Sequence, residues 1–280
     1  MATVPDVTRN AESNAEGVVE SNAEPPLRRE RDGRGVVTLT LNRPQSFNAL
    51  SESLLTALQA ELDALARDTS ARVLVLAGAG KAFCAGHDLR EMRAQPSLTY
   101  YQRLFAQCSR MMLSLLRLPM PVIARVHGTA TAAGCQLVAQ CDLAVASSEA
   151  RFAVSGVKLG LFCSTPAVAL TRNVPRKEAF EMLVTGDFLD AAQAQACGLV
   201  NRIAAPAALD AEVEKLLASI LAKPRMAIAM GKELFYRQAE LGIEAAYEAA
   251  VQTIACNMMD PAALEGVQAF IDKRPPHRGS

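Results

Sequence analysis

The sequence lacks an excess of charge of either sign, because lysine and arginine total 29 and aspartate and glutamate also total 29. A nucleic-acid-binding protein is expected to carry a basic excess, so this balance argues against a nucleic-acid partner. No uninterrupted apolar run reaches the roughly 18 residues of a membrane span, so we expect no membrane partner either. Half of the residues are hydrophobic, which is enough to form a sizeable core.

Histidine is also scarce, with three residues, and no Cys-x-x-Cys pair or Cys/His cluster has the spacing of a zinc site. We therefore predict no metal site. The cysteine count is odd, and most of the thiols fall in apolar runs. This pattern favours buried free thiols in a reducing cytoplasm. The seven are Cys84, Cys108, Cys135, Cys141, Cys163, Cys197 and Cys256.

The first 26 residues differ from the rest. They repeat Glu-Ser-Asn-Ala-Glu at 12–16 and 20–24, and they hold five acidic residues against one arginine, a net charge of −4. Such a segment cannot bury enough apolar surface to offset its ordering entropy, so residues 1–26 are predicted to form a disordered acidic tail. Its composition is the opposite of an arginine-rich mitochondrial presequence, which favours a cytoplasmic location.

From about residue 33 the pattern alternates between strands and helices. Apolar runs at 36–41, 73–76, 122–126 and 142–146 predict strands, and helical spacing follows Ser51 and covers 98–117. Strand, helix and strand in repetition indicate an α/β domain with crossover connections, which we place at residues 27–205.

After about residue 206 the strand signals end. Segments 207–222, 224–240, 243–258 and 261–272 all predict helices with apolar faces. We interpret residues 206–280 as a helical oligomerisation region that packs against partner subunits. The alternative is a helical layer on the chain's own domain.

Two glycine-containing loops carry the chemistry, Ala85-Gly86-His87-Asp88-Leu89 and Thr131-Ala132-Ala133-Gly134-Cys135-Gln136. Each follows a strand-like run, and small residues allow the backbone to approach a ligand closely. Two backbone N–H groups aimed at one point could hold the oxygen of a thioester as it becomes an enolate. The second loop also opens an apparent helix, whose N-terminus adds a positive field.

Together with other motifs, these loops resemble the enoyl-CoA hydratase/isomerase (crotonase) family. The resemblance runs from about residue 33 to Arg274 in the family's order and spacing. Its motifs are Leu41-Asn42-Arg43-Pro44, Asn48-Ala49-Leu50, Phe83 to Met92, Gly134-Cys135-Gln136-Leu137, Cys141 to Ala146 and Ala196-Cys197-Gly198-Leu199-Val200.

The resemblance implies a spiral of ββα repeats, a C-terminal helical trimerisation region, and homotrimers that often pair into homohexamers. It implies an acyl-CoA substrate, with coenzyme A as part of the substrate and no separate cofactor. The oxyanion donors would be the N–H groups of His87 and Ala133, and the strip Ala85 to Leu89 would meet the adenine and pantetheine. Phe270 and Lys273 would reach a neighbour's coenzyme A. The remaining expected substrate-binding residues are Arg43, Phe47, Asp88, Arg90, Gly134 and Cys163.

The chain departs from the family's pattern at both catalytic glutamates. The family's hydratases place two glutamates around one water, so both must be able to titrate. The first position holds Gln136 and the second holds Gly156. Neither can transfer a proton as a carboxylate does, although Gln136 can hold a water or a substrate group. The catalytic candidates are therefore His87, Ala133 and Gln136, and we expect weak or absent hydration.

Two further side chains have open roles. The imidazole of His87 is either catalytic or a local packing group, and a His at this position also resembles the family's methylmalonyl-CoA decarboxylases, which place a tyrosine where this chain has Cys163. Cys163 or Ser164 could line the acyl pocket, or Thr165-Pro166 could simply begin a helix. No adjacent base can be named that would make Cys163 a nucleophile.

We therefore expect an enoyl-CoA hydratase/isomerase-family enzyme, a lyase or isomerase of acyl-CoA or fatty-acid metabolism. Two alternatives remain open: an acyl-CoA decarboxylase or thioesterase of the same fold, and a non-catalytic acyl-CoA-binding or assembly protein.

Overall fold

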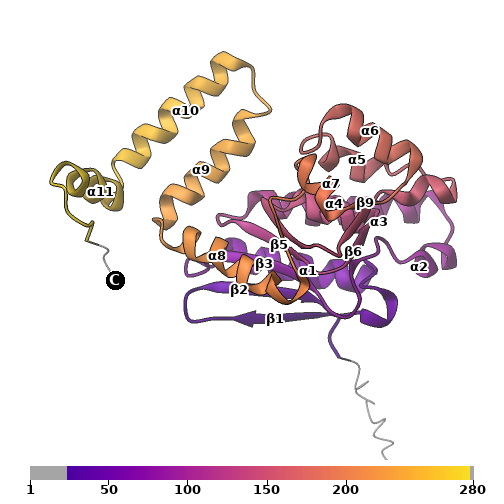
Figure 1. Cartoon of the computed structure of the whole chain (residues 1–280). Helices are drawn as coiled ribbons and strands as arrows, with labels where there is room; N and C mark the ends of the chain where they lie inside the picture. The colour runs from indigo at the N-terminus through magenta and orange to yellow at the C-terminus, as the bar shows by residue number, and fades with distance from the viewer. Residues whose placement is uncertain (1–23, 278–280) are drawn as a thin grey trace, which may run out of the picture.

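The computed structural model describes residues 24–277, which form two β-sheets surrounded by helices (Figure 1). The predicted tail, residues 1–26, therefore falls outside the described residues except for its last three. The six-stranded sheet contains, in spatial order, β1 (Leu27–Arg31), β2 (Val36–Leu41), β3 (Val73–Gly78), β5 (Val122–Val126), β7 (Leu143–Ser147) and β10 (Arg202–Ala204). The four-stranded sheet contains β4 (Ala82–Cys84), β6 (Thr129–Thr131), β8 (Arg151–Ala153) and β9 (Leu189–Asp190).

The chain alternates between the two sheets. The pairs β3–β4, β5–β6 and β7–β8 each give one strand to each sheet, and a helix follows each pair. All strand pairings are parallel except β1–β2 and β8–β9. The helices that follow are α2 (Leu89–Ala94) and α3 (Leu98–Arg117), then α4 (Ala133–Gln140), then α5 (Ser164–Leu170). This is the expected α/β fold with ββα repeats, and it brings the loops after β4 and β6 to the same end of the small sheet.

Helices cover both faces of the large sheet. On one face, α1 (Glu52–Arg67) packs five buried leucines and is capped by Ser51, whose side chain accepts from the Leu54 N–H. On the other face, α8 (Leu209–Leu221) packs Leu209, Val213, Leu216 and Leu217 against β-strand valines in a second core. The helix α8 lies in the segment that was predicted to be an oligomerisation region, and it packs on the sheet of its own chain.

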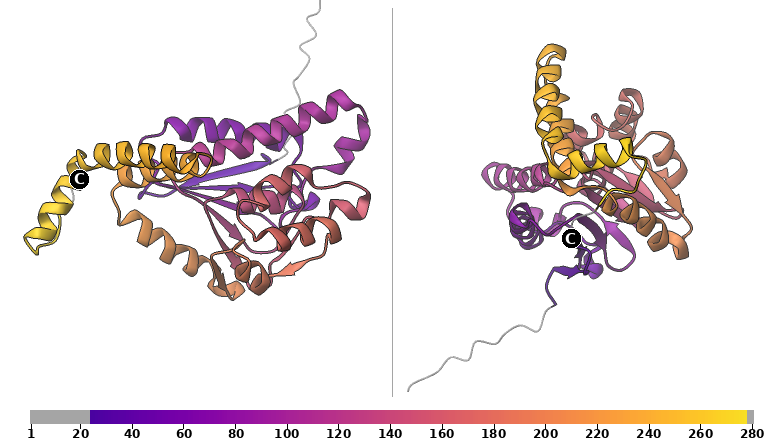
Figure 2. Two further views of the ribbon diagram at one scale, coloured as in Figure 1. Left: turned by 90° about the horizontal axis from the view of Figure 1, so that it is seen from above. Right: turned by 90° about the vertical axis from the view of Figure 1, so that its left-hand side faces the viewer.

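The last three helices form an arm that projects from this body. They are α9 (Arg225–Gln238), α10 (Ile243–Met258) and α11 (Pro261–Ile271). Figure 2 shows α10 and α11 extending beyond the sheets. The arm exposes large apolar side chains, among them Phe235, Tyr247 and Val251.

The remaining elements are short. They are α6 (Arg176–Thr185), α7 (Ala191–Ala196) and the 3-10 helices η1 (Pro44–Ser46), η2 (Ser155–Leu159) and η3 (Pro206–Ala208). Six of the seven cysteines are buried and free, and Cys256 is free and exposed. Within residues 24–277, none of the helices combines the length and the hydropathy needed to cross a membrane.

Candidate active site

A pocket of about 350 Å³ opens between the two glycine-containing loops and the segment that joins β8 to α5. Its lining is mainly apolar. The lining residues are Ala85, His87, Leu89, Met92, Phe105, Ala132, Ala133, Ser155, Gly156, Leu159, Leu161, Phe162, Cys163, Ser164, Thr165 and Pro166. The sequence motifs for the two loops therefore do locate one shared cavity.

The first loop follows β4 and is held by the backbone of residues 47–50. The Ala85 N–H donates to the Phe47 carbonyl at 3.0 Å, and the Leu50 N–H donates to the Gly86 carbonyl at 2.7 Å. The Asp88 N–H donates to the Leu50 carbonyl at 3.2 Å. The N–H of His87, between these bonds, donates to no group among residues 24–277. These backbone hydrogen bonds between the first loop and residues 47–50, called the ladder below, leave the His87 N–H as a free donor at the pocket wall.

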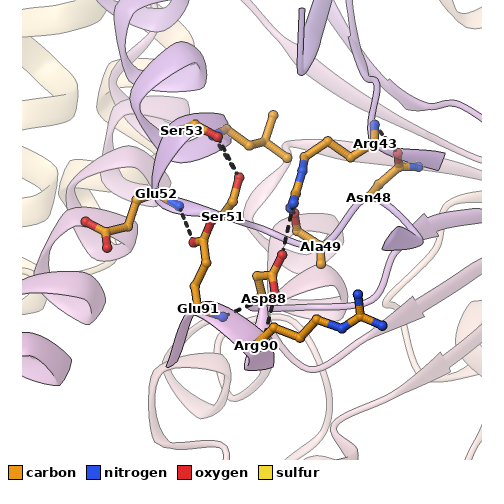
Figure 3. Close-up of polar contacts among 10 residues, drawn as sticks. Arg43, Asn48, Ala49, Ser51, Glu52, Ser53, Asp88, Arg90 and Glu91 are labelled. Atoms are coloured by element: carbon orange, nitrogen blue, oxygen red, sulfur yellow. Dashed lines mark hydrogen bonds and ion pairs between the residues drawn. The ribbon is translucent and has the colours of Figure 1, made fainter. Parts of the chain in front are cut away.

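Side chains reinforce the same ladder, as Figure 3 shows. Arg43 donates from Nη2 to Asp88 Oδ2 at 3.0 Å and from Nη1 to the Ala49 carbonyl at 2.6 Å. Asp88 also caps α2, where it accepts from the N–H groups of Arg90 and Glu91. Burial raises the pKa of Asp88, but the hydrogen bonds from Arg43 and from these N–H groups outweigh it and lower that pKa overall.

A buried asparagine completes this support. Asn48 is fully buried, and its Nδ2 donates to the carbonyls of Ala79 and Ala82, both at 2.8 Å, and of Phe83 at 3.2 Å. Its Oδ1 accepts from the Arg43 N–H at 2.9 Å. Asn48 therefore joins the 43–50 segment to the start of the first loop.

The second loop joins β6 to α4. Ala132 is the residue before the helix and has φ 49° and ψ −120°, a conformation that favours glycine. No side chain caps α4. The N–H of Ala133, the first helical residue, donates to no group in the described part of the chain. The helix thus begins on a strained residue and leaves its first donors free.

The two loops touch. A Cβ placed on Gly86 would lie 2.9 Å from Ala132 Cβ and 3.2 Å from the Ala133 nitrogen, so only glycine allows this approach. A Cβ on Gly134 would lie 2.0 Å from the Cys84 carbonyl oxygen, which places the start of α4 directly on β4. The free N–H groups of His87 and Ala133 therefore belong to one compact backbone assembly.

The His87 ring lines this pocket and is largely buried. Its edge packs on Phe105, with ring centroids 5.2 Å apart and an interplanar angle of 84°. Neither ring nitrogen has a hydrogen-bond partner in the described residues. Desolvation lowers the pKa of His87 to about 4, and a smaller contribution from the Leu50 backbone opposes that effect. The imidazole is therefore neutral at pH 7 and offers one donor and one acceptor.

The two positions expected to hold glutamates carry no charge. Gln136 is 4% exposed, and its Oε1 is buried without a partner in the described part of the chain. At Gly156, an added Cβ would lie 2.7 Å from Cys163 Sγ and 2.6 Å from the Leu161 carbonyl oxygen. The Cys163 thiol thus fills the space in which a side chain at position 156 would begin. Burial raises the pKa of Cys163, with a smaller opposing effect from the Gly156 backbone.

Five of the predicted site residues line the pocket: Ala85, His87, Leu89, Ala133 and Cys163. A helix does begin at Ser164, so Cys163 both precedes that helix and lines the pocket. The other predicted residues lie outside the lining. Phe270 and Lys273 sit at the end of the arm, where Phe270 is 85% exposed. Their substrate contacts, like those of Arg43, Phe47, Asp88, Arg90 and Gly134, stay predictions.

Sequence reasoning gave no role to several residues that build the site. Met92, Phe105, Ser155 and Leu159 line the pocket, and Asn48 anchors the first loop. Asn48 and Met92 lie within motifs that resemble the family, and this was the available signal. Phe105, Ser155 and Leu159 are apolar or small residues without a distinctive spacing.

Comparison with known proteins agrees with this architecture. Residues 31–280 match the family described as enoyl-CoA hydratase/isomerase. The mouse mitochondrial enoyl-CoA hydratase domain-containing protein 3 is 40% identical over 260 residues, which cover 93% of this chain and 87% of the mouse protein.

Two crystal structures are similar over nearly the whole chain. An enoyl-CoA hydratase of Mycobacterium smegmatis is 66% identical with a TM-score of 0.90, covering 91% of this chain and 99% of the other. Human enoyl-coenzyme A hydratase domain-containing protein 3 is 39% identical with a TM-score of 0.86, covering 90% and 100%.

Proposed function

The chain belongs to the enoyl-CoA hydratase/isomerase family, and from that premise we propose that it binds acyl-CoA thioesters and stabilises negative charge on the thioester oxygen. The N–H groups of His87 and Ala133 are the proposed donors. The observation that carries this proposal is that both groups lack an acceptor within residues 24–277 while their residues line one pocket.

These donors suit a thioester for a physical reason. Charge builds on the thioester oxygen when its α carbon loses a proton, and fixed donors in a water-poor site stabilise that charge without reorganising. The strained Ala132 and the ladder of residues 47–50 hold both loops in place before a ligand arrives. Preorganisation of this kind is what makes backbone donors effective in catalysis.

A matched pair of ligands tests the role of the two N–H groups. Butyryl-CoA and its thioether S-butyl-CoA share the coenzyme A and the chain, but only the first has a carbonyl oxygen. Calorimetric titration should show butyryl-CoA binding about tenfold tighter, the equivalent of about 1.4 kcal/mol. Equal affinities for the two would remove the oxyanion role, and no thermal stabilisation by any acyl-CoA would remove the proposed function.

We also propose that crotonyl-CoA hydration is weak in this chain. A hydratase needs groups that exchange protons with water, but Gln136 is an amide and Gly156 has no side chain. A spectrophotometric assay should give a turnover number far below about 1,000 per second, which is the upper part of the usual enzyme range. A rate near that value would show that another group replaces the two carboxylates.

One observation supports acyl-CoA binding without turnover as a second candidate. The titratable side chains at the pocket wall are His87 and Cys163, and their shifted pKa values leave both neutral at pH 7. Exchange of the substrate's α protons in D₂O, followed by mass spectrometry, separates the two candidates. Incorporation of deuterium supports enolate formation, and its absence together with tight binding supports a binding protein.

A further inference from the structure

The helix α2 forms one wall of the pocket but has little apolar packing of its own. Leu89 and Met92 are three residues apart, so they lie on one face of α2, and both line the cavity. None of the six residues of α2 is fully buried, and only Met92 packs against the main core. Residues 93–99, which follow, are all exposed. Because few buried contacts mean low local stability, polar contacts must fix the place of this wall.

Two sets of polar contacts hold the ends of α2. Asp88 caps the first turn by accepting from the Arg90 N–H at 3.1 Å and from the Glu91 N–H at 3.5 Å. The Tyr101 hydroxyl of α3 donates to the Met92 carbonyl at 3.1 Å. The N-terminal end of α2 is thereby tied to the first loop, and its C-terminal end is tied to α3.

A third contact joins the middle of α2 to α1. The Glu91 side chain is outside the pocket lining, and its Oε2 accepts from the Glu52 N–H at 2.9 Å (Figure 3). Glu52 is the first residue of α1, whose five buried leucines fix it in the core. The first N–H groups of a helix have no acceptor within it and produce a positive field, which suits a carboxylate. Glu91 therefore links a helix with little core of its own to one that is firmly packed.

We propose that Glu91 is a positioning residue for the pocket wall: by binding the N-terminus of α1, it sets how closely Leu89 and Met92 approach a bound acyl chain. The proposal rests on the proposed acyl-CoA binding and adds a residue that shapes the site without touching the ligand. The ladder holds the His87 N–H by separate hydrogen bonds. Loss of the Glu91 contact should therefore disturb the wall more than the oxyanion donors.

The length of the acyl chain separates these two parts of the site. Acetyl-CoA has the carbonyl oxygen but almost no chain, whereas hexanoyl-CoA has a chain that can meet the wall. In calorimetric titration, Glu91→Leu should weaken hexanoyl-CoA binding by at least about tenfold and acetyl-CoA binding by less than about threefold, because apolar contact with the chain is lost. Glu91→Gln keeps an oxygen acceptor for the Glu52 N–H and should reduce the hexanoyl-CoA loss to below about threefold.

A control variant and a substitute variant complete the titrations. Glu181→Leu makes the same substitution at an exposed position of α6, outside the lining, and should leave both affinities unchanged. Glu91→Asp keeps the charge but shortens the side chain, and it takes the place of Glu91→Leu should that variant fail to fold. Equal weakening of the two ligands, or no weakening, in a folded variant would overturn the proposal. If the parent chain binds neither ligand better than free coenzyme A, the proposed function fails, and the ligand-free protein then decides the role of Glu91.

The methyl group of Met92 reports the position of the wall without a ligand. In protein labelled with carbon-13 at the methionine methyl groups, the NMR signal of Met92 should move in Glu91→Leu and return close to its parent position in Glu91→Gln. The signal of Met182, which is buried on α6, should stay in place in both variants. An unchanged Met92 signal in Glu91→Leu would show that the wall keeps its position without the Glu91 contact, and it would overturn the proposal.

Discussion

His87 is a neutral imidazole that the folded chain keeps away from water. Its pKa is lowered from 6.5 to about 4 by desolvation, whereas an unfolded chain would protonate it near 6.5. Between these values the unfolded state binds the extra proton. The free energy of unfolding should therefore fall as the pH drops from about 6.5 to about 4, by up to about 3 kcal/mol from this residue.

A histidine variant makes this prediction specific. His87→Gln should flatten the pH dependence of chemical unfolding in that window. An NMR titration of the ring protons provides a direct check, because His87 should stay neutral from pH 8 to pH 5.5. A His87 titration near pH 6.5 would contradict the buried, unpartnered environment.

The Arg43–Asp88 pair is predicted to position the first loop. The two side chains are 24% and 11% exposed, so water screens their interaction only partly. A double-mutant cycle with Arg43→Met and Asp88→Asn should give a coupling free energy of about 1.5 kcal/mol in chemical unfolding. The asparagine of Asp88→Asn can still cap α2. This variant therefore removes the ion pair without removing the helix cap.

Binding shows whether the pair acts on the site or only on stability. Each single variant should weaken butyryl-CoA binding more than S-butyl-CoA binding, because a displaced His87 N–H serves only the carbonyl oxygen. Arg43→Lys should weaken butyryl-CoA binding less than Arg43→Met does. Lysine keeps the positive charge but cannot contact Asp88 and the Ala49 carbonyl at the same time as a guanidinium does. Equal weakening of both ligands would assign the pair a purely structural role.

The turn from β6 into α4 contains a residue with a strained backbone conformation. Ala132 has φ 49°, and Ala132→Gly should raise the free energy of unfolding by about 1 kcal/mol, because glycine adopts this conformation without strain. Gly134→Ala should lower it by about 3 kcal/mol or more, because the new Cβ would lie 2.0 Å from the Cys84 oxygen. Chemical unfolding of both variants tests these two predictions. A decrease in the free energy of unfolding in Ala132→Gly would contradict the strain at Ala132.

Long elements with regularly spaced apolar residues were predictable from the sequence. The helix at 98–117 and the strand at 36–41 have the predicted bounds because each has a complete apolar face. The small sheet was not predicted, because β4, β6, β8 and β9 are two or three residues long and show no period. The six-residue helix α7 was missed for a similar reason. The ten-residue helix α6 was missed although Ala179, Met182 and Leu183 recur at helical spacing on its buried face.

The site was predictable where backbone motifs carry it and not where distant side chains meet. The two glycine-containing loops indicated His87 and Ala133. The Arg43–Asp88 pair joins residues 45 positions apart, and nothing in the local sequence reports such a contact. The packing of Cys163 on Gly156 likewise depends on how the segment between β8 and α5 folds back.

The arm α9–α11 is tied to the body at its root by a buried lysine. Lys232 Nζ donates to the carbonyls of Leu115 and Met120, both at 2.9 Å, and to Asp142 Oδ2 at 2.7 Å. The Tyr236 hydroxyl donates to Asp142 Oδ1 at 2.7 Å. Burial lowers the pKa of Lys232, and the Asp142 carboxylate opposes that effect. The middle and the second half of α9 are thus fixed, while α10 and α11 extend without comparable contacts to the sheets (Figure 2).

One face of α10 carries a stripe of exposed apolar side chains, and the assembly into trimers or hexamers stays a prediction. Tyr247, Val251, Ile254 and Met258 recur at helical spacing and are 68%, 58%, 59% and 42% exposed. A stripe of this kind is expected to be covered by another copy of the chain. The double variant Val251→Glu with Ile254→Glu should therefore yield monomers in sedimentation velocity, whereas Ala218→Glu with Ser219→Glu on exposed positions of α8 should not.

The same variants test whether the arm completes a neighbour's site. Phe270 and Lys273 lie at the far end of the arm, beyond α10, and outside the pocket lining of their own chain. If they reach the coenzyme A of an adjacent subunit, the monomeric variant should bind butyryl-CoA at least about tenfold more weakly, because a phosphate contact and an apolar contact are lost together. Lys273→Ala in the intact oligomer should produce a smaller loss of the same kind. A monomer that binds as tightly as the parent would confine the whole binding site to one chain and leave the arm a role in assembly alone.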